Sequence, residues 1–226
     1  ATPFDLEAVQ MLDTLMDSFK IASADLTNKP LLKAVGEKQK HVILSCGASS
    51  YDEIESALKT LQDAGTSSID LLHCVLNYPC KVANSYLSHI SNLKARFESD
   101  VVQIGYSDHI PSTEVDDDQL IVALTLGCRV FERHFTYDTS LEGNDHYHAL
   151  DEKHMTKIIK RMKQILPTIN GCVEEEVLHN QMDARKQARR SLVLGRSLKK
   201  GDILKETDLI CKRPGTGISP TVIETI

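Results

Sequence analysis

The sequence predicts an α/β fold whose parallel sheet is built from repeated βα units. Short apolar runs typical of strands begin near residues 19, 41, 69, 101 and 130, about 22 to 32 residues apart. Between them lie stretches with the apolar spacing of helices, and this alternation is typical of a parallel sheet. The run at 69–74 is almost continuously apolar, as expected for a strand that is buried on both faces.

Two architectures share this pattern, an eight-stranded (β/α) barrel and an open doubly wound sheet. No GxGxxG follows a predicted strand, so the sequence lacks a dinucleotide-binding fingerprint. The chain opens on a helical stretch and contains five predicted strands, whereas a complete barrel has eight and needs about 250 residues. We therefore predict a (β/α)8 TIM barrel that lacks its N-terminal units, about three of them, so that the chain is a fragment.

The helices are predicted from amphipathic spacing and from the residues that start or stop them. They cover residues 5–16, 30–37, 50–63, 86–97, 120–126 and 151–166. Pro3 and Asp5 suit the start of the first helix, and Ser50 opens the third, which Gly65 ends. Pro167 is expected to stop the last helix, because proline cannot donate a backbone hydrogen bond.

The chain changes character after residue 166. Glu174–Glu175–Glu176 and the polar run at 179–185 indicate a solvated linker. Beyond it we predict a strand at 188–194, a turn at 198–202, a short capped turn and strand at 204–210, and a tight loop at 213–218. The predicted organisation is therefore a barrel domain at 1–166, a linker at 167–186 and a small β-rich domain at 187–226.

Composition excludes several classes of protein. The formal charge of −6 argues against non-specific binding of nucleic acid. No run approaches the ~20 apolar residues of a membrane-spanning helix, and the N-terminus does not resemble a signal peptide. The six cysteines form no CxxC pair, and several lie within apolar strands, so we expect reduced thiols in a cytoplasmic protein.

Polar residues follow the predicted strands at their carboxyl ends, which is where parallel barrels carry their active sites. Strand by strand, they are Lys20, Ser23 and Asp25; Ser45; His73 and Tyr78; Ser107, Asp108 and His109; Glu132, Arg133 and His134. Because five consecutive strands share this feature, the pattern indicates a site more strongly than any single residue does.

His109 and His134 each lie just past the end of a predicted strand. Neighbouring parallel strands lie about 5 Å apart, so both imidazoles can reach one metal ion. A metal held by two histidines keeps open positions for water and substrate, and it can polarise a carbonyl group. Lys20 and the nearby hydroxyls suit a phosphate or carboxylate, while Asp25 and Asp145 can hold hydroxyls or move protons.

Each candidate also has a structural interpretation. Lys20 can face outward along a helix, and His109 and His134 can be hydrogen-bonded core residues. Three others can simply close a strand or anchor a loop: Ser23, Ser45 and Tyr78. We expect His73 to be buried for structural reasons. His146 and His148 can chelate a metal, but we favour a solvated loop or a substrate rim for both.

At these residues the chain resembles the sialic acid synthase family, whose members condense phosphoenolpyruvate with N-acetylmannosamine or related sugars. The resemblance covers essentially the whole chain in order, with matching segments at 19–23, 44–47, 73–74, 78–79, 105–109, 132–136 and 143–146. The end of the chain, from 188 to 215, resembles the antifreeze-like (SAF, β-clip) domain of that family.

The resemblance implies a role for each candidate. His109 and His134 would bind a divalent metal, Mn²⁺ or Mg²⁺. Phosphoenolpyruvate would be held by Lys20, Ser23 and Ser107, with Ser45 beside them. The residues that would face the sugar and act in catalysis are Asp25, Tyr78 and Asp145. Arg190 would reach the sugar's acyl group in the partner subunit of a domain-swapped homodimer.

The implied reaction joins C3 of phosphoenolpyruvate to the metal-activated aldehyde of the sugar. Water adds at C2, and phosphate leaves with cleavage of a C–O bond. An alternative within the family is a legionaminate or pseudaminate synthase, which uses a 6-deoxy diamino sugar. An alternative of another class is a non-catalytic sugar-phosphate binding protein, which we would expect to have lost Lys20, His109 or His134.

The sequence departs from the family pattern at two positions. Leu76 stands where some members have an asparagine that touches phosphoenolpyruvate, and Asp25 stands where another has glutamate. The early strands, which carry an acidic residue and a lysine that the family uses, are expected to be absent, and the SAF domain is short. We therefore expect residues 1–226 by themselves to be inactive.

Overall fold

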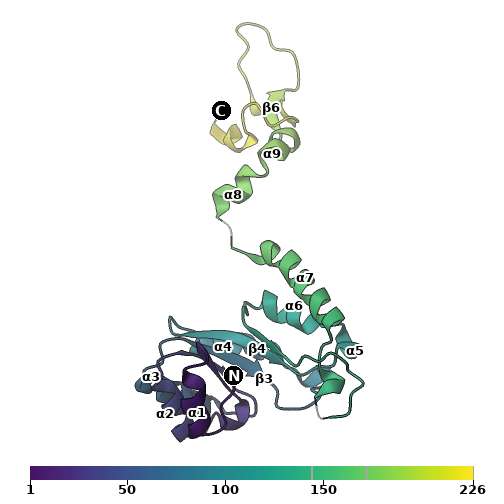
Figure 1. Cartoon of the computed structure of the whole chain (residues 1–226). Coiled ribbons are helices and arrows are strands. Elements are labelled where there is room, and N and C mark those ends of the chain that lie inside the picture. Colours follow the sequence, from purple (N-terminus) through teal and green to yellow (C-terminus); the bar gives the residue numbers. More distant parts are fainter. Residues whose placement is uncertain (144, 172, 226) are drawn as a thin grey trace. The chain divides into compact units, whose positions relative to one another are not determined.

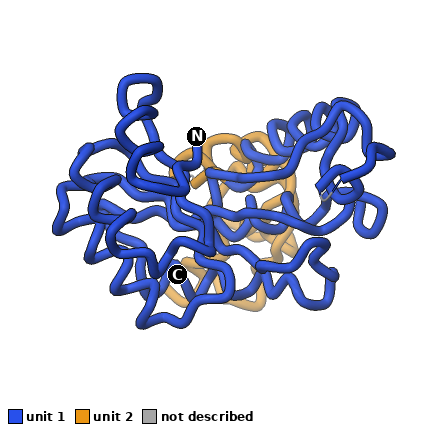
Figure 2. The backbone as a smooth tube through the Cα atoms, turned by 60° about the horizontal axis from the view of Figure 1, so that its bottom comes forward, with its two compact units in different colours: residues 1–169 blue, residues 170–226 orange. Residues whose placement is uncertain are grey.

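The computed structural model describes residues 1–143, 145–171 and 173–225. Asn144 of the family resemblance and Cys172 lie outside the described residues. The chain divides into two compact units, residues 1–169 and 170–226, which Figure 2 shows in different colours. The finer division at 166 and 186 stays a prediction.

The first unit contains a five-stranded parallel sheet whose strands lie side by side in the order of the sequence. They are β1 (Ser18–Ile21), β2 (His41–Ser45), β3 (Ile69–Cys74), β4 (Val102–Asp108) and β5 (Phe131–Arg133). In an open doubly wound sheet the strand order reverses at a switch point, and no reversal occurs among these strands. The sheet is therefore a curled half-barrel, with all five strands where the apolar runs predicted them.

Helices connect the strands and cover the sheet (Figure 1). They are α1 (Leu6–Asp13), α2 (Lys29–Gly36), α3 (Tyr51–Ala64), α4 (His89–Phe97), α5 (Ser112–Val115), α6 (Asp118–Thr125) and α7 (Glu152–Ile169). Local chemistry sets their ends: Ser50 and Glu53 form a capping box at the start of α3, and Gly65 ends it at φ 119°. Apart from the short helix α5, which was not predicted, these boundaries match the predicted helices to within a few residues.

The core lies between the sheet and its helices. All six residues of β3 are buried, and the largest fully buried side chains include Phe19, Leu44, Leu61 and Leu71. Gly105 lets β4 sit close to its neighbours, since a Cβ there would lie 2.4 Å from Leu72 Cδ2 and 2.7 Å from the Val130 carbonyl oxygen. Burial of these apolar side chains is the main force that holds the strand ends in register.

One prediction about the later part of the chain is wrong, and one stretch contains helices that the sequence did not predict. Helix α7 runs through Pro167 to Ile169, because a proline near the end of a helix removes one hydrogen bond from a turn that is about to stop. The stretch predicted as a linker contains α8 (Glu174–His179) and α9 (Met182–Ala188). The three glutamates occupy the first turn of α8, where acidic side chains interact favourably with the helix dipole.

The second unit also contains an antiparallel pair, β6 (Ser191–Leu194) and β7 (Leu209–Lys212). Short 3-10 turns lie at Glu206–Asp208 and Pro220–Thr225. Arg196 and Asp208 pair within the loop between the strands, with Nη2 and Oδ2 2.9 Å apart. The identity of this unit as an SAF domain stays a prediction.

The cysteines of the described residues carry free thiols: Cys46, Cys74, Cys80, Cys128 and Cys211. The first four are buried, in agreement with the prediction that the cysteines behave as small apolar residues. Among the described residues, no helix combines the length and the apolar character needed to cross a membrane.

Candidate active site

Polar side chains from four strands meet around Glu132 at the carboxyl end of the sheet. Ser107 Oγ donates a hydrogen bond to Glu132 Oε2 at 2.7 Å, and Ser45 Oγ donates to the same oxygen at 3.4 Å. Lys20 Nζ lies 3.5 Å from Glu132 Oε1 and donates to the carbonyl oxygen of Ile21 at 2.8 Å. We call the side of the sheet that carries these groups the inner face. The Lys20 side chain lies on this face and not on the face that the helices cover.

Burial governs the charge state of the Lys20 ammonium group. Its side chain is 14% exposed, and this desolvation lowers the pKa of Lys20, while the nearby Glu132 carboxylate opposes the shift. Glu132 followed a predicted strand like several other polar residues, and the sequence offered no sign that three donors would converge on it. A cation and two hydroxyls gathered in this way form a site that can bind an anion.

Ser23 and Cys74 continue the inner-face cluster beside Gly47. Ser23 Oγ accepts a hydrogen bond from the backbone N–H of Gly47 at 2.9 Å. A Cβ on residue 47 would lie 2.9 Å from Ser23 Oγ and 3.1 Å from Cys74 Sγ, so this close approach requires glycine. Leu76 also borders the cluster, since its Cβ lies 3.2 Å from the point that a Cβ on residue 47 would occupy.

The imidazoles of His109, His134 and His148 lie next to the inner-face cluster. The ring centroids of His109 and His134 are 5.2 Å apart, those of His134 and His148 are 4.8 Å apart, and those of His109 and His148 are 6.2 Å apart. His109 Nδ1 lies 3.0 Å from the Val75 carbonyl oxygen. Because a carbonyl can only accept, Nδ1 carries the hydrogen and Nε2 keeps its lone pair for a ligand.

Asp145 and Tyr78 complete the histidine cluster. Asp145 Oδ2 lies 3.7 Å from His134 Nδ1. The Tyr78 ring centroid lies 4.2 Å from that of His109 and 5.7 Å from those of His134 and His148. The two residues also line an open pocket of about 510 Å³ together with His134, Gly143 and Tyr147. The sequence-predicted residues Tyr78, His109, His134 and Asp145 are thus brought together.

The prediction that His148 lies on a solvated loop or rim is wrong. Its side chain is 0% exposed, whereas His146 is partly exposed and its Nδ1 lies 2.7 Å from Thr136 Oγ1. Two backbone hydrogen bonds join the start and the end of this loop: Leu150 N donates to His134 O at 2.9 Å, and Thr136 N donates to Leu150 O at 2.8 Å. The His-x-His spacing was the available signal, but spacing does not show which way a loop side chain turns.

Burial keeps the imidazoles of His109 and His148 neutral near neutral pH. Desolvation lowers the pKa of His109, against the hydrogen bond to Val75 and with help from the nearby His134. Desolvation, with a further contribution from His134, lowers the pKa of His148 to about 4. Metal ligands must be unprotonated, so these rings are in the form that binds a metal.

The donor set of the cluster fits a divalent metal. One nitrogen from each of His134 and His148 and one oxygen of Asp145 all lie within 4.8 Å of one another. Neither nitrogen of His148 has a hydrogen-bond partner among the described residues, although the ring is fully buried. Imidazole nitrogens and a carboxylate oxygen are common ligands of first-row divalent ions.

The neighbours of His109 and His134 in the sequence hold the two strand ends together on the opposite, outer face of the sheet. Arg133 Nη1 lies 2.7 Å from Asp108 Oδ2, and the two side chains are 4% and 0% exposed. Asp108 also accepts hydrogen bonds from Tyr106 Oη at 2.8 Å and Gln119 Nε2 at 2.7 Å. Asp108 and Arg133 are paired in register across β4 and β5, so this ion pair aligns the two histidines that follow.

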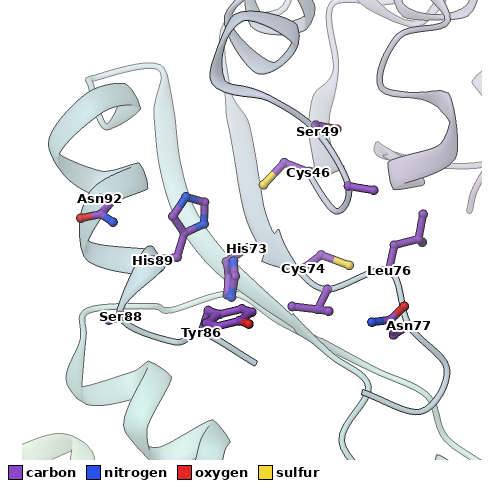
Figure 3. Close-up of a pocket in the computed structure, with 12 residues that line it drawn as sticks. Cys46, Ser49, His73, Cys74, Leu76, Asn77, Tyr86, Ser88, His89 and Asn92 are labelled. Carbon is purple, nitrogen blue, oxygen red and sulfur yellow. The ribbon is translucent and has the colours of Figure 1, made fainter. Parts of the chain in front are cut away.

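A second, larger pocket of about 830 Å³ lies past the ends of β2 and β3 (Figure 3). Cys46, Cys74 and Leu76 line it, together with His73 and His89. His73 is buried, as predicted, and its Nε2 donates to the Ser85 carbonyl oxygen at 2.8 Å. Cys74 belongs both to this pocket and to the inner-face cluster, so the pocket adjoins the candidate active site.

The side-chain hydrogen bonds found for two predicted site residues lie outside the two clusters described above. Asp25 lies in a 3-10 turn, Ser23–Asp25, and its Oδ1 accepts a hydrogen bond from Asn28 Nδ2 at 2.9 Å. Arg190 lies just before β6 in the second unit, and its Nη1 donates to the carbonyl oxygen of Cys211 at 3.3 Å. The roles predicted for these two side chains stay predictions.

Comparison with known proteins identifies relatives of the chain. The NeuB family matches residues 1–173. N,N'-diacetyllegionaminic acid synthase of Campylobacter jejuni is 36% identical over 222 residues, which are 97% of this chain and 64% of that protein. N-acetylneuraminate-9-phosphate synthase of Drosophila melanogaster is 31% identical, over 94% of this chain and 62% of that protein.

A solved structure has a similar fold. It is the crystal structure of N-acetylneuraminic acid (sialic acid) synthetase from Leptospira borgpetersenii in complex with citrate. The two superpose with a TM-score of 0.72 at 31% sequence identity, over 82% of this chain and 63% of that one. This chain therefore spans less than two thirds of the length of each of these three relatives.

Proposed function

The chain belongs to the NeuB family, and we propose that the protein that carries it is a nonulosonic acid synthase. The proposed reaction joins phosphoenolpyruvate to an N-acyl hexosamine and releases phosphate. The observation that carries the proposal is the placement of the anion-binding cluster of Lys20, Ser45 and Ser107 beside the histidine cluster. The two meet where Cys74 Sγ, at the edge of the first, lies 4.0 Å from His109 Nδ1. Two such clusters suit a reaction between an anionic substrate and a carbonyl substrate.

Phosphoenolpyruvate is assigned to the inner-face cluster. Lys20 supplies a positive charge, and Ser23, Ser45 and Ser107 supply hydroxyl donors. In the free protein the Glu132 carboxylate holds the ammonium group and two of the hydroxyls in one place, and the bound anion takes over these donors. Desolvation lowers the pKa of Lys20. A bound anion favours the charged ammonium form, so it raises this pKa again and keeps Lys20 protonated.

The sugar is assigned to the pocket of about 510 Å³ that Tyr78, His134 and Asp145 line. A divalent metal held at His109 and His134 would polarise the carbonyl oxygen of the open-chain sugar. Asp145 is placed to hold a sugar hydroxyl or to move a proton, and Tyr78 orients the sugar against the imidazoles. The arrangement positions the two substrates for attack, which is a large part of the rate enhancement available to an enzyme.

The bond changes balance as follows. C3 of phosphoenolpyruvate forms a bond to the aldehyde carbon, and the aldehyde oxygen takes up a proton. Water adds to C2 and gives up one proton. The hydroxyl left on C2 passes its proton to phosphate as the C–O bond between C2 and phosphate breaks, and C2 becomes a carbonyl. Asp25 faces the sugar, and Arg190 of one protomer reaches the acyl group in its partner's site, in a domain-swapped homodimer.

The experiment measures phosphate release from phosphoenolpyruvate by the full-length protein, with and without a divalent metal. The sugar panel contains N-acetylmannosamine, its 6-phosphate and a 6-deoxy diamino hexose, which separate the three kinds of synthase. We expect release with one member of the panel. Lys20→Ala should abolish it, whereas Lys59→Ala, which removes a lysine that is 74% exposed on α3, should leave it unchanged.

Two results would count against the proposal. Absence of phosphate release with every sugar, in the presence of Mn²⁺, Mg²⁺ and Co²⁺ in turn, would contradict it directly. Binding of phosphoenolpyruvate and a sugar without turnover would instead indicate the non-catalytic sugar-phosphate binding protein.

A further inference from the structure

We propose that His148 is a third imidazole ligand of the metal site, and that this site therefore prefers a late first-row ion such as Co²⁺, Ni²⁺ or Zn²⁺ to Mg²⁺. The inference rests on the metal site that the proposed function places at His109 and His134. It concerns a residue outside that pair, and it makes the site richer in nitrogen ligands than two histidines would.

The first observation is the hydrogen-bonding state of the His148 ring. The ring is fully buried, and neither Nδ1 nor Nε2 has a partner among the described residues. Buried side-chain nitrogens nearly always have a partner, since an unsatisfied one destabilises the folded protein. A metal that accepts the lone pair of one nitrogen satisfies the ring in the way that a hydrogen bond otherwise would.

The second observation is the distance between candidate ligand atoms. Those of His134, Asp145 and His148 lie within 4.8 Å of one another. Two nitrogen atoms bound to the same ion at about 2.1 Å lie at most about 4.2 Å apart. Small side-chain rotations therefore bring these atoms onto one ion. His109 lies outside this group, but its ring centroid is 5.2 Å from that of His134, and its Nε2 keeps its lone pair.

The loop that carries His148 is held by hydrogen bonds on both sides of it. Tyr147 Oη donates to the Tyr78 carbonyl oxygen at 2.8 Å, and Leu150 N donates to His134 O at 2.9 Å. These bonds tie residues 147 and 150 to elements that carry other members of the cluster. The position of the ring beside His134 therefore follows from the backbone, and not from a rotation of an exposed side chain.

His146 provides an internal contrast on the same turn, His146–His148. Its ring is partly exposed, and its Nδ1 is paired with Thr136 Oγ1 at 2.7 Å. One histidine of the pair thus has a structural partner, and the other has none among the residues that the structure describes. This difference makes His146 a matched control for His148.

The ligand set determines which ions the site favours. Imidazole nitrogens suit zinc, copper, iron and nickel, whereas Mg²⁺ prefers carboxylate, carbonyl and water oxygens. Three imidazoles and the Asp145 carboxylate give a site with a majority of nitrogen ligands. We therefore infer selectivity against Mg²⁺, which differs from the Mn²⁺ or Mg²⁺ that the family resemblance implied.

The test is direct metal binding by the full-length protein after removal of bound ions with a chelator. Co²⁺ is added, and its visible absorption spectrum and dissociation constant are measured, followed by competition with Zn²⁺ and Mg²⁺. The variants are His148→Leu and, as the control, His146→Leu. His148→Gln, a polar residue of similar length, serves as a second variant should His148→Leu fail to fold.

We expect His148→Leu to weaken Co²⁺ binding at least about tenfold, since even loss of a group that only orients a ligand costs 10–100-fold. The Co²⁺ spectrum should change, because the ligand set changes. The melting temperature of the metal-free protein should stay the same or rise, because an unsatisfied buried group is removed. The stabilisation by added Co²⁺ should shrink. His146→Leu should bind Co²⁺ as the unchanged protein does.

Wild-type affinity and an unchanged Co²⁺ spectrum in His148→Leu would overturn this inference. Equal affinity of the unchanged protein for Mg²⁺ and Co²⁺ would overturn its selectivity. His109→Ala and His134→Ala distinguish the inference from the proposed function. If they lose Co²⁺ binding while His148→Leu keeps it, the inference alone fails; if they also keep it, the metal site of the proposed function fails.

Discussion

The carboxyl ends of β4 and β5 carry two polar clusters that differ in how fully their groups are paired. On the outer face, Asp108 accepts hydrogen bonds from Tyr106, Gln119 and the backbone N–H of Ile110, and it pairs with Arg133. On the inner face, His148 has no partner for either nitrogen among the described residues. The Asp108 carboxylate is fully paired by the protein itself, although Nε and Nη1 of Arg133 and Oε1 of Gln119 have no hydrogen-bond partner among the described residues. The His148 ring, in contrast, leaves both of its nitrogens for a ligand.

In each strand, the residue of the outer-face cluster and the histidine of the inner-face cluster are consecutive in the sequence. Asp108 precedes His109, and Arg133 precedes His134, so each strand end contributes one residue to each cluster. Successive side chains of a strand point to opposite faces of the sheet, which places neighbours in the sequence in different environments. The comparison teaches that a face built around a fully paired carboxylate supports a face whose groups remain available to ligands.

The largest effect expected from breaking the paired face is that of Arg133→Met. Removal of the guanidinium leaves the Asp108 carboxylate buried without its charge partner. We expect the free energy of unfolding to fall by about 3–5 kcal/mol, as measured by urea denaturation followed by circular dichroism. The double variant Arg133→Met, Asp108→Leu should recover part of this loss, because no buried charge remains. A loss below about 1 kcal/mol in the single variant would contradict the role of the ion pair.

Tyr106→Phe should have the next largest effect. It removes one hydrogen bond, of 2.8 Å, to a carboxylate that is fully buried. Hydrogen bonds to charged groups contribute about 1.5–3 kcal/mol, and we expect a loss of this size in the same denaturation experiment. A variant as stable as the unchanged protein would mean that Gln119, Ile110 and Arg133 satisfy Asp108 without the phenol.

His73, which stacks on Tyr106 on the outer face, predicts a dependence of stability on pH. Burial lowers the pKa of His73, and the hydrogen bond to Ser85 only partly offsets this. In the unfolded chain the imidazole takes up a proton near pH 6.5, whereas folded His73 stays neutral there. The unfolded state binds more protons, so this contribution is complete above about pH 6.5 and is lost as the pH falls below it.

The measurement is urea denaturation of the unchanged protein and His73→Gln between about pH 8 and pH 5. The slope of stability against pH should be shallower in the variant below pH 6.5, by up to about 1.4 kcal/mol per pH unit. The other histidines are common to both proteins, so the difference isolates His73. Parallel profiles would show that this residue does not contribute.

Ser107→Ala should have the smallest effect on stability and should sharpen the contrast between the faces. Ser107 also donates to a carboxylate at 2.7 Å, but the side chain of Glu132 is 40% exposed, so water can replace the hydroxyl. We expect a loss below about 1 kcal/mol in the free energy of unfolding. Phosphate release from phosphoenolpyruvate should fall at least about tenfold, because a hydrogen bond to the charged substrate is lost. The reverse pattern would place Ser107 among the structural residues.

Much of the barrel sheet was predictable from local sequence. The apolar run at 69–74 corresponds to β3 without a shift, because a strand that is buried on both faces is rich in apolar residues, and its two polar residues, Asp70 and His73, have hydrogen-bond partners. The approach of His109 to His134 was predictable for a related reason, since adjacent parallel strands end side by side. The helices at 174–188 were missed because their polar composition is equally typical of a linker.

The sequence by itself determined which residues build the strands and which polar side chains stand at their ends, because both depend on neighbours within a few positions. Tertiary structure alone decided that Asp108 pairs with Arg133, that three donors converge on Glu132, and that His148 turns inward while His146 does not. These outcomes depend on contacts between residues far apart in the chain. The direction of a side chain in a loop is set by what the fold packs against it, and no local pattern records that.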